Sequence, residues 1–307
     1  MIRKHTRRAA KAAFAVSFGV AIILGLLAGT ARSAPTAAPT IVMANKNFDE
    51  ARILGQLYKQ ALEAKGFNVS YKGDLGSTEL IHTALTSGKI NFYPEYTGTI
   101  LTAVHHKTTS PKTAAATYKL AKALEAKNGL TLLAMTPFYD TDVIAVTNAT
   151  AKKYGLKTVS DLKKVGSFKF AGFPECETRT QCYVGLTKTY GVTKAEFVPL
   201  AGISAYAALD AGTVLAADVF SSDPVLGKNS KYTVLTDPKH IGGFQNVAPI
   251  VKASVVKDGG AQFAKTVNAV SALLTQDAIV AMNKAVSIDK KSAASVAKAF
   301  LSANNLT

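Results

Sequence analysis

A short apolar strand, Ile41-Val42-Met43-Ala44, leads into the polar run Asn45-Lys46-Asn47-Phe48-Asp49-Glu50, and an amphipathic segment follows. Apolar residues of that segment recur with a helical period, and the pattern stops at Gly66. Asn47 is predicted to cap this helix, with Glu50 three residues later completing a capping box. The stretch therefore predicts the first strand and the first helix of an α/β fold.

The same alternation continues beyond this helix. A second strand is predicted over residues 68–71, a second helix from residues 76–78 to Gly88, and a third strand over residues 90–93. This β-α-β-α-β order predicts a parallel sheet. The loops after its first two strands bring two helix N-termini to one edge, where ligands of open α/β sheets bind. We expect the functional site at that edge.

A second alternating unit follows from residue 143. Further strands are predicted over residues 143–147, 168–171, 214–220 and 247–252; helices are predicted from the cap Ser160, over residues 204–211, and over residues 261–274, 278–285 and 291–303. The first and last of these strands are interpreted as two crossings between lobes. The predicted fold class is a two-lobed α/β protein, with residues 40–142 and 248–307 in lobe 1 and residues 143–247 in lobe 2, hinged around a cleft.

The N-terminus has the pattern of a secretory signal peptide over residues 1–34. Basic residues come first, an uncharged stretch covers residues 12–30, and small residues and prolines follow. The apolar part, residues 14–28, is shorter than a membrane-spanning helix requires, so cleavage is expected, with an uncleaved anchor as the alternative. No cysteine lies near the cleavage region to carry a lipid anchor. These features predict a free periplasmic protein.

The chain is basic, with a formal net charge of +16. Residues 1–34 hold six basic and no acidic residues, so their removal leaves +10. The remaining lysines are spread among apolar positions without a dense run, which argues against nucleic-acid binding. About 270 residues remain, enough for two domains of ordinary size.

Cys176 and Cys182 enclose five residues, among them Arg179. In an oxidising compartment a disulfide between them is the favoured interpretation, and it would hold Arg179 in place. Chain-entropy estimates for so short a loop give about 2–2.5 kcal/mol. A redox pair or a metal site is disfavoured because the C-x-x-C spacing and clustered histidines are missing.

The sequence carries no catalytic signature of the nucleophile-elbow, zinc-protease or phosphate-loop type. His105-His106 is interpreted as a pair in a solvated Thr/Lys-rich loop and not as a metal site. We therefore expect neither an enzyme nor a bound metal or cofactor.

One run does suggest chemistry, namely Tyr93-Pro94-Glu95-Tyr96-Thr97-Gly98-Thr99 at the predicted cleft edge. Tyrosine rings attract a cation that donates no hydrogen bonds, at about 0.5–2 kcal/mol per desolvated ring. The alternative is that the tyrosines belong to the core.

These residues resemble the glycine betaine/carnitine/choline-binding proteins of osmoprotectant ABC importers. The resemblance rests on the tyrosine-rich run and on further runs in family order, which are residues 45–48, 53–55, 75–78, 138–146, 159–162 and 244–251. It implies a type II periplasmic binding protein whose ligand lies between the lobes. The ammonium group would then lie in an aromatic cage, and a carboxylate would be held by basic side chains and N–H groups.

The resemblance also implies a set of ligand-binding positions. They are Lys46, Thr78, Tyr93, Tyr96, Thr99, Asp140, Asp142, Arg179, Phe220 and Phe244. Lys46 and Arg179 match carboxylate partners, Thr99 matches a hydrogen-bond donor, Tyr96 matches a cage wall, and Asp140 matches an acidic position near the linking strand. For Arg179 an ordinary surface arginine is the alternative.

The chain departs from the family where further cage tyrosines are common, since it has Asp142, Phe220 and Phe244 there. Phenylalanine keeps the ring face but loses the hydroxyl. A carboxylate in place of a ring would favour a cation such as choline over a zwitterion. The alternative for Asp142 is a linker residue that points away from the ligand.

The expected function is that of a monomeric binding protein that delivers a quaternary ammonium compound to an ABC permease in the inner membrane. A ligand sensor for a membrane receptor and an enzyme on the same scaffold are alternatives, because fold alone does not separate them. A different cationic or amino-acid-like solute is also left open, as is the choice among choline, glycine betaine and carnitine.

Overall fold

The computed structural model describes residues 40–109, 111–200 and 204–307. The predicted signal peptide, residues 1–34, lies outside these ranges. Within them, no helix has both the length and the apolar character needed to cross a membrane.

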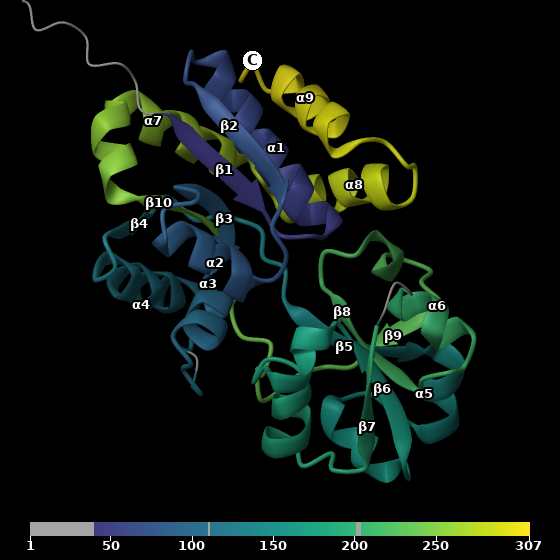
Figure 1. Cartoon of the computed structure of the whole chain (residues 1–307). Coiled ribbons are helices and arrows are strands. Elements are labelled where there is room, and N and C mark those ends of the chain that lie inside the picture. The colour runs from purple at the N-terminus through teal and green to yellow at the C-terminus, as the bar shows by residue number, and fades with distance from the viewer. Residues whose placement is uncertain (1–39, 110, 201–203) are drawn as a thin grey trace, which may run out of the picture. The chain divides into compact units, whose positions relative to one another are not determined.

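The first sheet contains five strands in the order β2-β1-β3-β10-β4 (Figure 1). Their bounds are β1 Ile41–Asn45, β2 Val69–Asp74, β3 Phe92–Tyr96, β4 Leu130–Leu132 and β10 Val247–Lys252. β1 pairs in parallel with β2 and β3, as the alternating order predicted. β10 then adds antiparallel contacts to β3 and β4. We call this sheet and its helices the first lobe.

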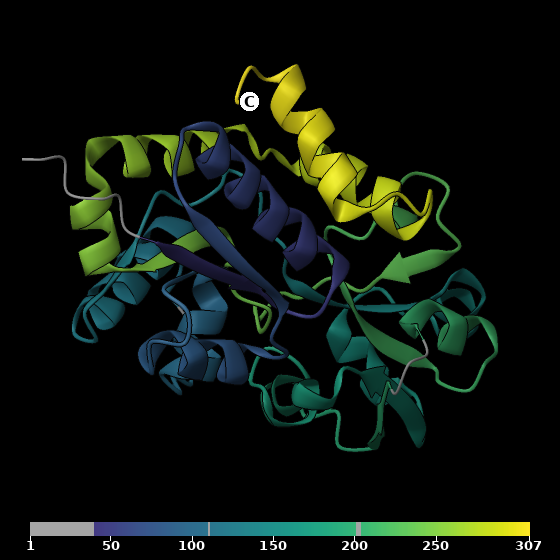
Figure 2. The same cartoon turned by 45° about the horizontal axis from the view of Figure 1, so that its top comes forward.

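Helices cover both faces of the first sheet. α1 (Asp49–Ala64) packs against α7 (Ala253–Leu273), α8 (Gln276–Ser287) and α9 (Ala293–Ala303), so the C-terminal helices pack beside the first one (Figure 2). The opposite face carries α2 (Thr78–Thr86), α4 (Ala114–Ala126), and the continuous turns α3 (Thr97–Thr99) and η1 (Ile100–Val104). α7 bends at Gly260, whose φ of +65° is favourable only for glycine.

The second sheet has the order β7-β6-β8-β5-β9, and with its helices it forms the second lobe. Its strands are β5 Asp142–Thr147, β6 Phe168–Gly172, β7 Ala195–Pro199, β8 Ala216–Phe220 and β9 Tyr232–Val234. The helical segments are α5 Asn148–Tyr154, α6 Ala205–Asp210 and the short turns η2 Val159–Lys164, η3 Pro174–Thr178, η4 Gly185–Thr189 and η5 Pro224–Leu226. β6 is parallel to β7 and β8, whereas β5 is antiparallel to β8 and β9.

The interpretation of residues 143–147 and 247–252 as crossings is wrong. Both segments are sheet strands with a hydrogen-bonded neighbour on each side, β5 in the second lobe and β10 in the first. The chain instead crosses beside them, where Tyr139 and Asn246 form an isolated antiparallel bridge. Asp140 N–H also donates to the Gln245 carbonyl at 3.2 Å, so the two crossings are paired.

Three local predictions are also corrected. α1 begins at Asp49 with Phe48 as the residue before it and no side-chain cap, so the Asn47–Glu50 capping box does not form. Thr158, and not Ser160, precedes η2, and the Asp161 carboxylate accepts the Thr158 N–H at 2.8 Å. The third strand covers Phe92–Tyr96 and not residues 90–93, because β10 pairs with the tyrosine-rich run itself.

Candidate ligand-binding site

A pocket opens where the loops after β1 and β3 face the end of β8 and the loop after β6. It encloses about 640 Å³ of empty space, part of which is open to solvent. The predicted site residues that line it are Lys46, Thr78, Tyr96, Thr99, Asp140, Asp142, Arg179 and Phe220. Both lobes therefore contribute to one pocket.

Four aromatic rings form a continuous stack in this pocket. Phe48 lies 6.1 Å from Phe220 with an interplanar angle of 13°, and 6.2 Å from Tyr96 with an angle of 29°, measured between ring centroids. Phe173 extends the stack beyond Phe220 at 5.9 Å. The ring stack thus consists of Tyr96 and Phe48 from the first lobe and Phe220 and Phe173 from the second.

Sequence reasoning did not assign Phe48 and Phe173 to the site. Phe48 stood inside a quoted family run but was not named as a ligand residue. Phe173 follows β6 directly and is 41% exposed, which is unusual for a large apolar side chain. A ring placed just beyond the carboxyl end of a buried strand is the signal that could have identified it.

Lys46 has an internal partner at the ring stack. Its ammonium group lies 2.5 Å from Glu95 Oε1, 3.3 Å from Thr78 Oγ1 and 4.3 Å from the centroid of the Tyr96 ring. The side chains of Lys46 and Glu95 are both buried. The pair therefore places a protein cation over Tyr96, next to the space that the ring stack lines.

Tyr96 is fixed from its other end by Glu50. Its hydroxyl donates to Glu50 Oε1 at 2.7 Å, while Glu50 Oε2 accepts from the Ser222 hydroxyl at 2.6 Å and from Asn283 Nδ2 at 2.8 Å. Burial raises the pKa of Glu50, although these three hydrogen bonds oppose the shift. Because Glu50 is used in this way, its side chain cannot complete a helix cap.

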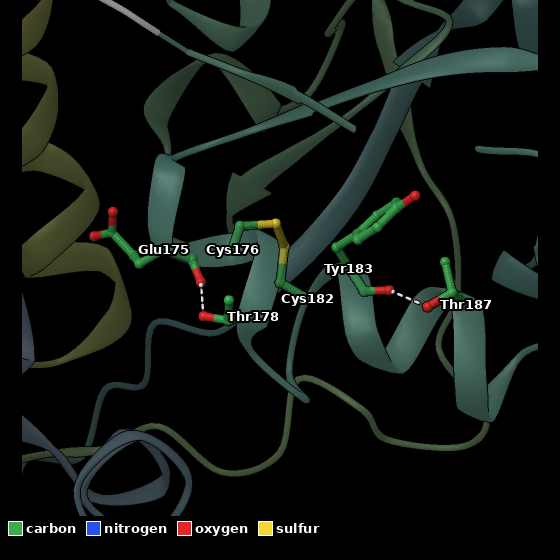
Figure 3. Close-up of a disulfide and its surroundings, with 6 residues drawn as sticks. All are labelled: Glu175, Cys176, Thr178, Cys182, Tyr183 and Thr187. Atoms are coloured by element: carbon green, nitrogen blue, oxygen red, sulfur yellow. Dashed lines mark hydrogen bonds between the residues drawn. A yellow bond between two sulfur atoms is a disulfide. The ribbon is translucent and has the colours of Figure 1, made fainter. Parts of the chain in front are cut away.

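The loop of residues 176–182 carries contacts between the lobes, and we call it the disulfide loop. Cys176 and Cys182 are bonded, as predicted (Figure 3). From this loop Arg179 Nη2 donates to both carboxylate oxygens of Glu79, at 3.1 and 3.2 Å. Gln181 donates to the Thr99 hydroxyl at 3.2 Å and accepts a hydrogen bond from the Thr102 hydroxyl.

Thr99 already has partners within the protein. Its N–H donates to Gln245 Oε1 at 2.9 Å and its hydroxyl lies 3.2 Å from the same oxygen. Gly98 permits this approach, because a Cβ there would lie 2.7 Å from the Phe244 carbonyl oxygen. The run of residues 97–99 is therefore packed directly against the second crossing between the lobes.

Asp140, Asp142 and Asp218 bring three carboxylates into the same pocket. Burial is the main cause that raises the pKa of each, and in Asp218 the neighbouring charge of Asp142 adds to the shift. The positive charge of Arg179 opposes the shift in Asp142 and Asp218. Asp218 was not predicted, although a charged residue inside the apolar strand of residues 214–220 is a usable signal.

Tyr93 and Phe244 do not line this pocket. The Tyr93 side chain is buried in the core of the first lobe, with its hydroxyl 3.2 Å from His82 Nδ1. Phe244 lines a different surface pocket, together with residues of the disulfide loop and η4. The prediction of a solvated His105 is wrong, because its Nε2 lies 2.8 Å from Glu125 Oε1 and the ring is largely buried.

One group of potential metal ligands comes together in the described ranges, namely Cys176, Cys182 and Asp218. The two sulfur atoms are bonded to each other and so are not available as thiolate ligands. The arrangement therefore offers a buried carboxylate beside a disulfide and not a metal centre.

Comparison with known proteins decides the family. Residues 39–303 match the model of the OpuAC family, described as the substrate-binding domain of the ABC-type glycine betaine transport system. The chain belongs to the OpuAC family. It is thus the substrate-binding component of an ABC transport system, which confirms the predicted binding role. The predicted two-lobed fold agrees with that of solved binding proteins.

Relatives of this OpuAC protein align over most of their length. The glycine-betaine-binding protein of Pseudomonas aeruginosa is 30% identical over 281 residues, which cover 88% of this chain and 89% of the relative. The glycine betaine-binding protein YehZ of Escherichia coli is 29% identical, over 86% of this chain and 90% of the relative.

Solved structures agree with the fold. Apo YehZ from Escherichia coli has a TM-score of 0.63 at 26% identity, covering 88% of this chain and all of that one. A glycine betaine/carnitine/choline ABC transporter structure has a TM-score of 0.69 at 22% identity, covering 87% of this chain and 99% of that one. The second likeness concerns the fold alone.

Proposed function

We propose that this protein binds a small quaternary ammonium compound between its two lobes and delivers it to an ABC permease. The observation that carries the proposal is the ring stack, which draws two rings from each lobe. A methylated ammonium group has no N–H to donate, so ring faces are the surfaces that bind it well. The names of relatives that bind glycine betaine and carnitine support this ligand class.

The mode of capture is closure about the paired crossings at Tyr139 and Asn246. We place residues 40–141 and 247–307 in the first lobe and residues 142–246 in the second, one residue from each predicted bound, because β5 begins at Asp142 and β10 begins at Val247. Closure brings Phe48 and Phe220 face to face and joins Arg179 to Glu79. A ligand bound between the lobes would contact both of them and so favour the closed state over the open one.

The cellular setting follows from the same proposal. We place the protein in the periplasm, exported by a signal peptide over residues 1–34, and acting as a monomer beside its permease. Lys46, Thr78, Tyr96, Thr99, Asp140, Asp142, Arg179 and Phe220 remain the proposed ligand-binding positions, with Phe48, Phe173 and Asp218 added. Tyr93 is not retained as a ligand-binding position, because its side chain packs in the core on the face of the first sheet that α2 covers.

Isothermal titration calorimetry with choline, glycine betaine and carnitine tests the function. Tyr96→Ala should abolish binding. Phe220→Leu keeps apolar bulk but removes the ring, and it should weaken binding about 2- to 30-fold, the equivalent of about 0.5–2 kcal/mol for one cation–ring contact. Tyr154→Ala is the matched control, because it removes a tyrosine ring of α5 that lies outside the pocket, and this variant should bind normally. If no quaternary ammonium compound binds the wild-type protein, the proposal is wrong.

A further inference from the structure

Both cationic side chains of the pocket are already paired with carboxylates of the protein. Lys46 lies 2.5 Å from Glu95 Oε1, and Arg179 lies 3.1 Å from Glu79 Oε1. The Lys46–Glu95 pair is buried on both sides, so its charges are compensated inside the protein. At Lys46 a ligand carboxylate would have to displace Glu95, whereas Arg179 uses only Nη2 in its pair and keeps Nε buried without a partner among the described residues.

The pocket aspartates, in contrast, are not in ion-pair contact with a cation within the described residues, although the charge of Arg179 acts on Asp142 and Asp218 and that of Lys46 on Asp142. In the part of the chain that the structure describes, no ion pair includes Asp140, Asp142 or Asp218. Asp140 accepts hydrogen bonds from neutral groups, the Ser222 N–H at 2.9 Å and the Ser221 hydroxyl at 3.4 Å. Burial of such charges without a counter-charge costs several kcal/mol, on the order of the desolvation penalty for one ion.

Asp218 is the most informative of the three carboxylates. Its residue is 4% exposed and lines the pocket, and within the described ranges its carboxylate takes part in no hydrogen bond. Its carboxylate oxygens are absent from the fully enclosed, unpartnered side-chain atoms of the described residues, so they stay accessible from the pocket that Asp218 lines. A group that enters the pocket can therefore bind them. Such a group must carry positive charge or a hydrogen-bond donor.

The unpaired carboxylates lie directly beside the ring stack. Asp142 on β5 pairs in register with Phe220 on β8. Asp218 lies two residues before Phe220 on the same strand, so both side chains project from the same face of the sheet. The ring faces and the carboxylates therefore line the same pocket, and both favour a cationic ligand.

We propose that the pocket selects a small organic monocation that carries a quaternary ammonium group and no carboxylate, with Asp218 and Asp142 as its specificity-determining residues. This inference rests on the proposed function and adds the charge of the ligand to it. A zwitterion would bring its own carboxylate among three others, and like charges at close range in a poorly hydrated site repel strongly. A monocation instead supplies the counter-charge that the pocket lacks.

Choline and glycine betaine form a matched pair of probes, because they share the trimethylammonium group and differ by a hydroxymethyl group in place of a carboxylate. By titration calorimetry we expect choline to bind the full chain at least ~10-fold more tightly, equivalent to about 1.4 kcal/mol. Asp218→Asn should weaken choline at least ~10-fold and leave glycine betaine unchanged or tighter. Asp142→Asn should act in the same direction.

Asp210→Asn is the control, since this carboxylate of the second lobe pairs with Lys231 and lies outside the pocket. It should leave both affinities unchanged. Circular dichroism and thermal unfolding check that Asp218→Asn folds, which we expect because the change removes an uncompensated buried charge. Should that variant fail to fold, the ligand preference of the wild-type protein and of Asp142→Asn still decides the inference.

Two results separate failure of this inference from failure of the proposed function. If glycine betaine binds the wild-type protein as tightly as choline or more so, or if Asp218→Asn weakens both equally, the charge selection is overturned while capture of quaternary ammonium compounds stands. If neither probe nor any other quaternary ammonium compound binds, both fall together.

Discussion

Arg179 and Glu79 join the two lobes through hydrogen bonds of 3.1 and 3.2 Å from one guanidinium nitrogen. Burial opposes the ionisation of Glu79, yet hydrogen bonding by Ser77 and the charge of Arg179 lower the pKa of its carboxyl below the ordinary value. The carboxylate is therefore ionised near neutral pH. The pair fastens the pocket mouth and occupies Nη2 of the guanidinium, while Nε has no partner among the described residues.

Replacement of Glu79 should alter ligand choice. Glu79→Gln removes the carboxylate charge beside Arg179 Nη2, so the guanidinium attracts a ligand carboxylate more strongly. We expect the affinity for glycine betaine to rise about 5-fold, the equivalent of about 1 kcal/mol for a half-exposed ion pair, with little change for choline. Calorimetry measures both. Glu63→Gln, in a surface pair with Lys59 on α1, is the control. An unchanged affinity for glycine betaine would contradict the role given to this pair.

Removing one member of the Lys46–Glu95 pair should cost more stability than removing both. Lys46→Met leaves the buried Glu95 carboxylate without its cation and should lower the free energy of unfolding by about 3–5 kcal/mol. The double variant Lys46→Met/Glu95→Gln removes both charges and should regain most of that loss. Urea denaturation followed by circular dichroism gives the values. Equal losses in the single and double variants would show that the two charges do not act as a pair.

Ligand affinity should depend on pH in a defined direction. Burial raises the pKa of Asp218 and Asp140, so part of these carboxyls is protonated at pH values where an ordinary aspartate is ionised. A bound cation favours the ionised form, so its binding releases protons. Affinity for choline should therefore rise as pH increases above the range in which an ordinary aspartate ionises. Tighter binding at the acidic end would run against the charge assignment.

The same shifts act on the ligand-free protein with the opposite sign. A carboxyl whose pKa is raised by folding binds protons more readily in the folded state than in the unfolded state. Stability from this source is present at low pH and is lost as pH rises through the raised pKa. Asp218→Asn removes one such group, so its free energy of unfolding should fall less steeply with pH than that of the wild-type protein. Urea denaturation at a series of pH values checks the slope.

Loss of the disulfide should affect both folding and binding. For a loop of this length the cross-link contributes about 2 kcal/mol to the free energy of unfolding. Reduction, or the double variant Cys176→Ser/Cys182→Ser, should lower stability by about that amount and weaken ligand binding, because Arg179 and Gln181 lie on the loop. Dithiothreitol should change the wild-type protein and leave the double variant unaffected. Equal ligand affinity of oxidised and reduced protein would contradict a role for the loop in closure.

The elements with strong local patterns could be predicted from the sequence. The β1–α1 start and the parallel set β2-β1-β3 follow from apolar periodicity over residues 41–66 and from the order of the elements. α4 was not predicted, because its alanine- and lysine-rich sequence has a weak apolar face and only three buried positions. The helix cap at Asn47 failed for a different reason, since Glu50 is bound by residues as far away as Asn283.

The candidate site was only partly predictable for the same physical reason. Lys46, Tyr96 and Arg179 could be named by resemblance, but the carboxylates that pair with the two cations lie 49 and 100 residues away in the sequence. Phe48 and Phe173 become one surface only when the two sheets face each other. Asp218 could have been noticed in the sequence as an acidic residue in an apolar strand. Its position two residues before Phe220 on β8, on the same face, is what links it to the site.

The side chains that fasten the pocket mouth, Arg179 and Gln181, are held inside a small covalent ring. The disulfide restricts the conformations of this loop when it forms. The entropy cost of ordering the loop is therefore not repeated each time a ligand binds. Under the proposed function, unloading at the permease then requires the disulfide loop to break its polar contacts with Glu79, Thr99 and Thr102. The contacts of Ser222 with Glu50 and Asn283 and the Phe48–Phe220 stack must also separate. The disulfide loop would thus keep its conformation while the two lobes separate.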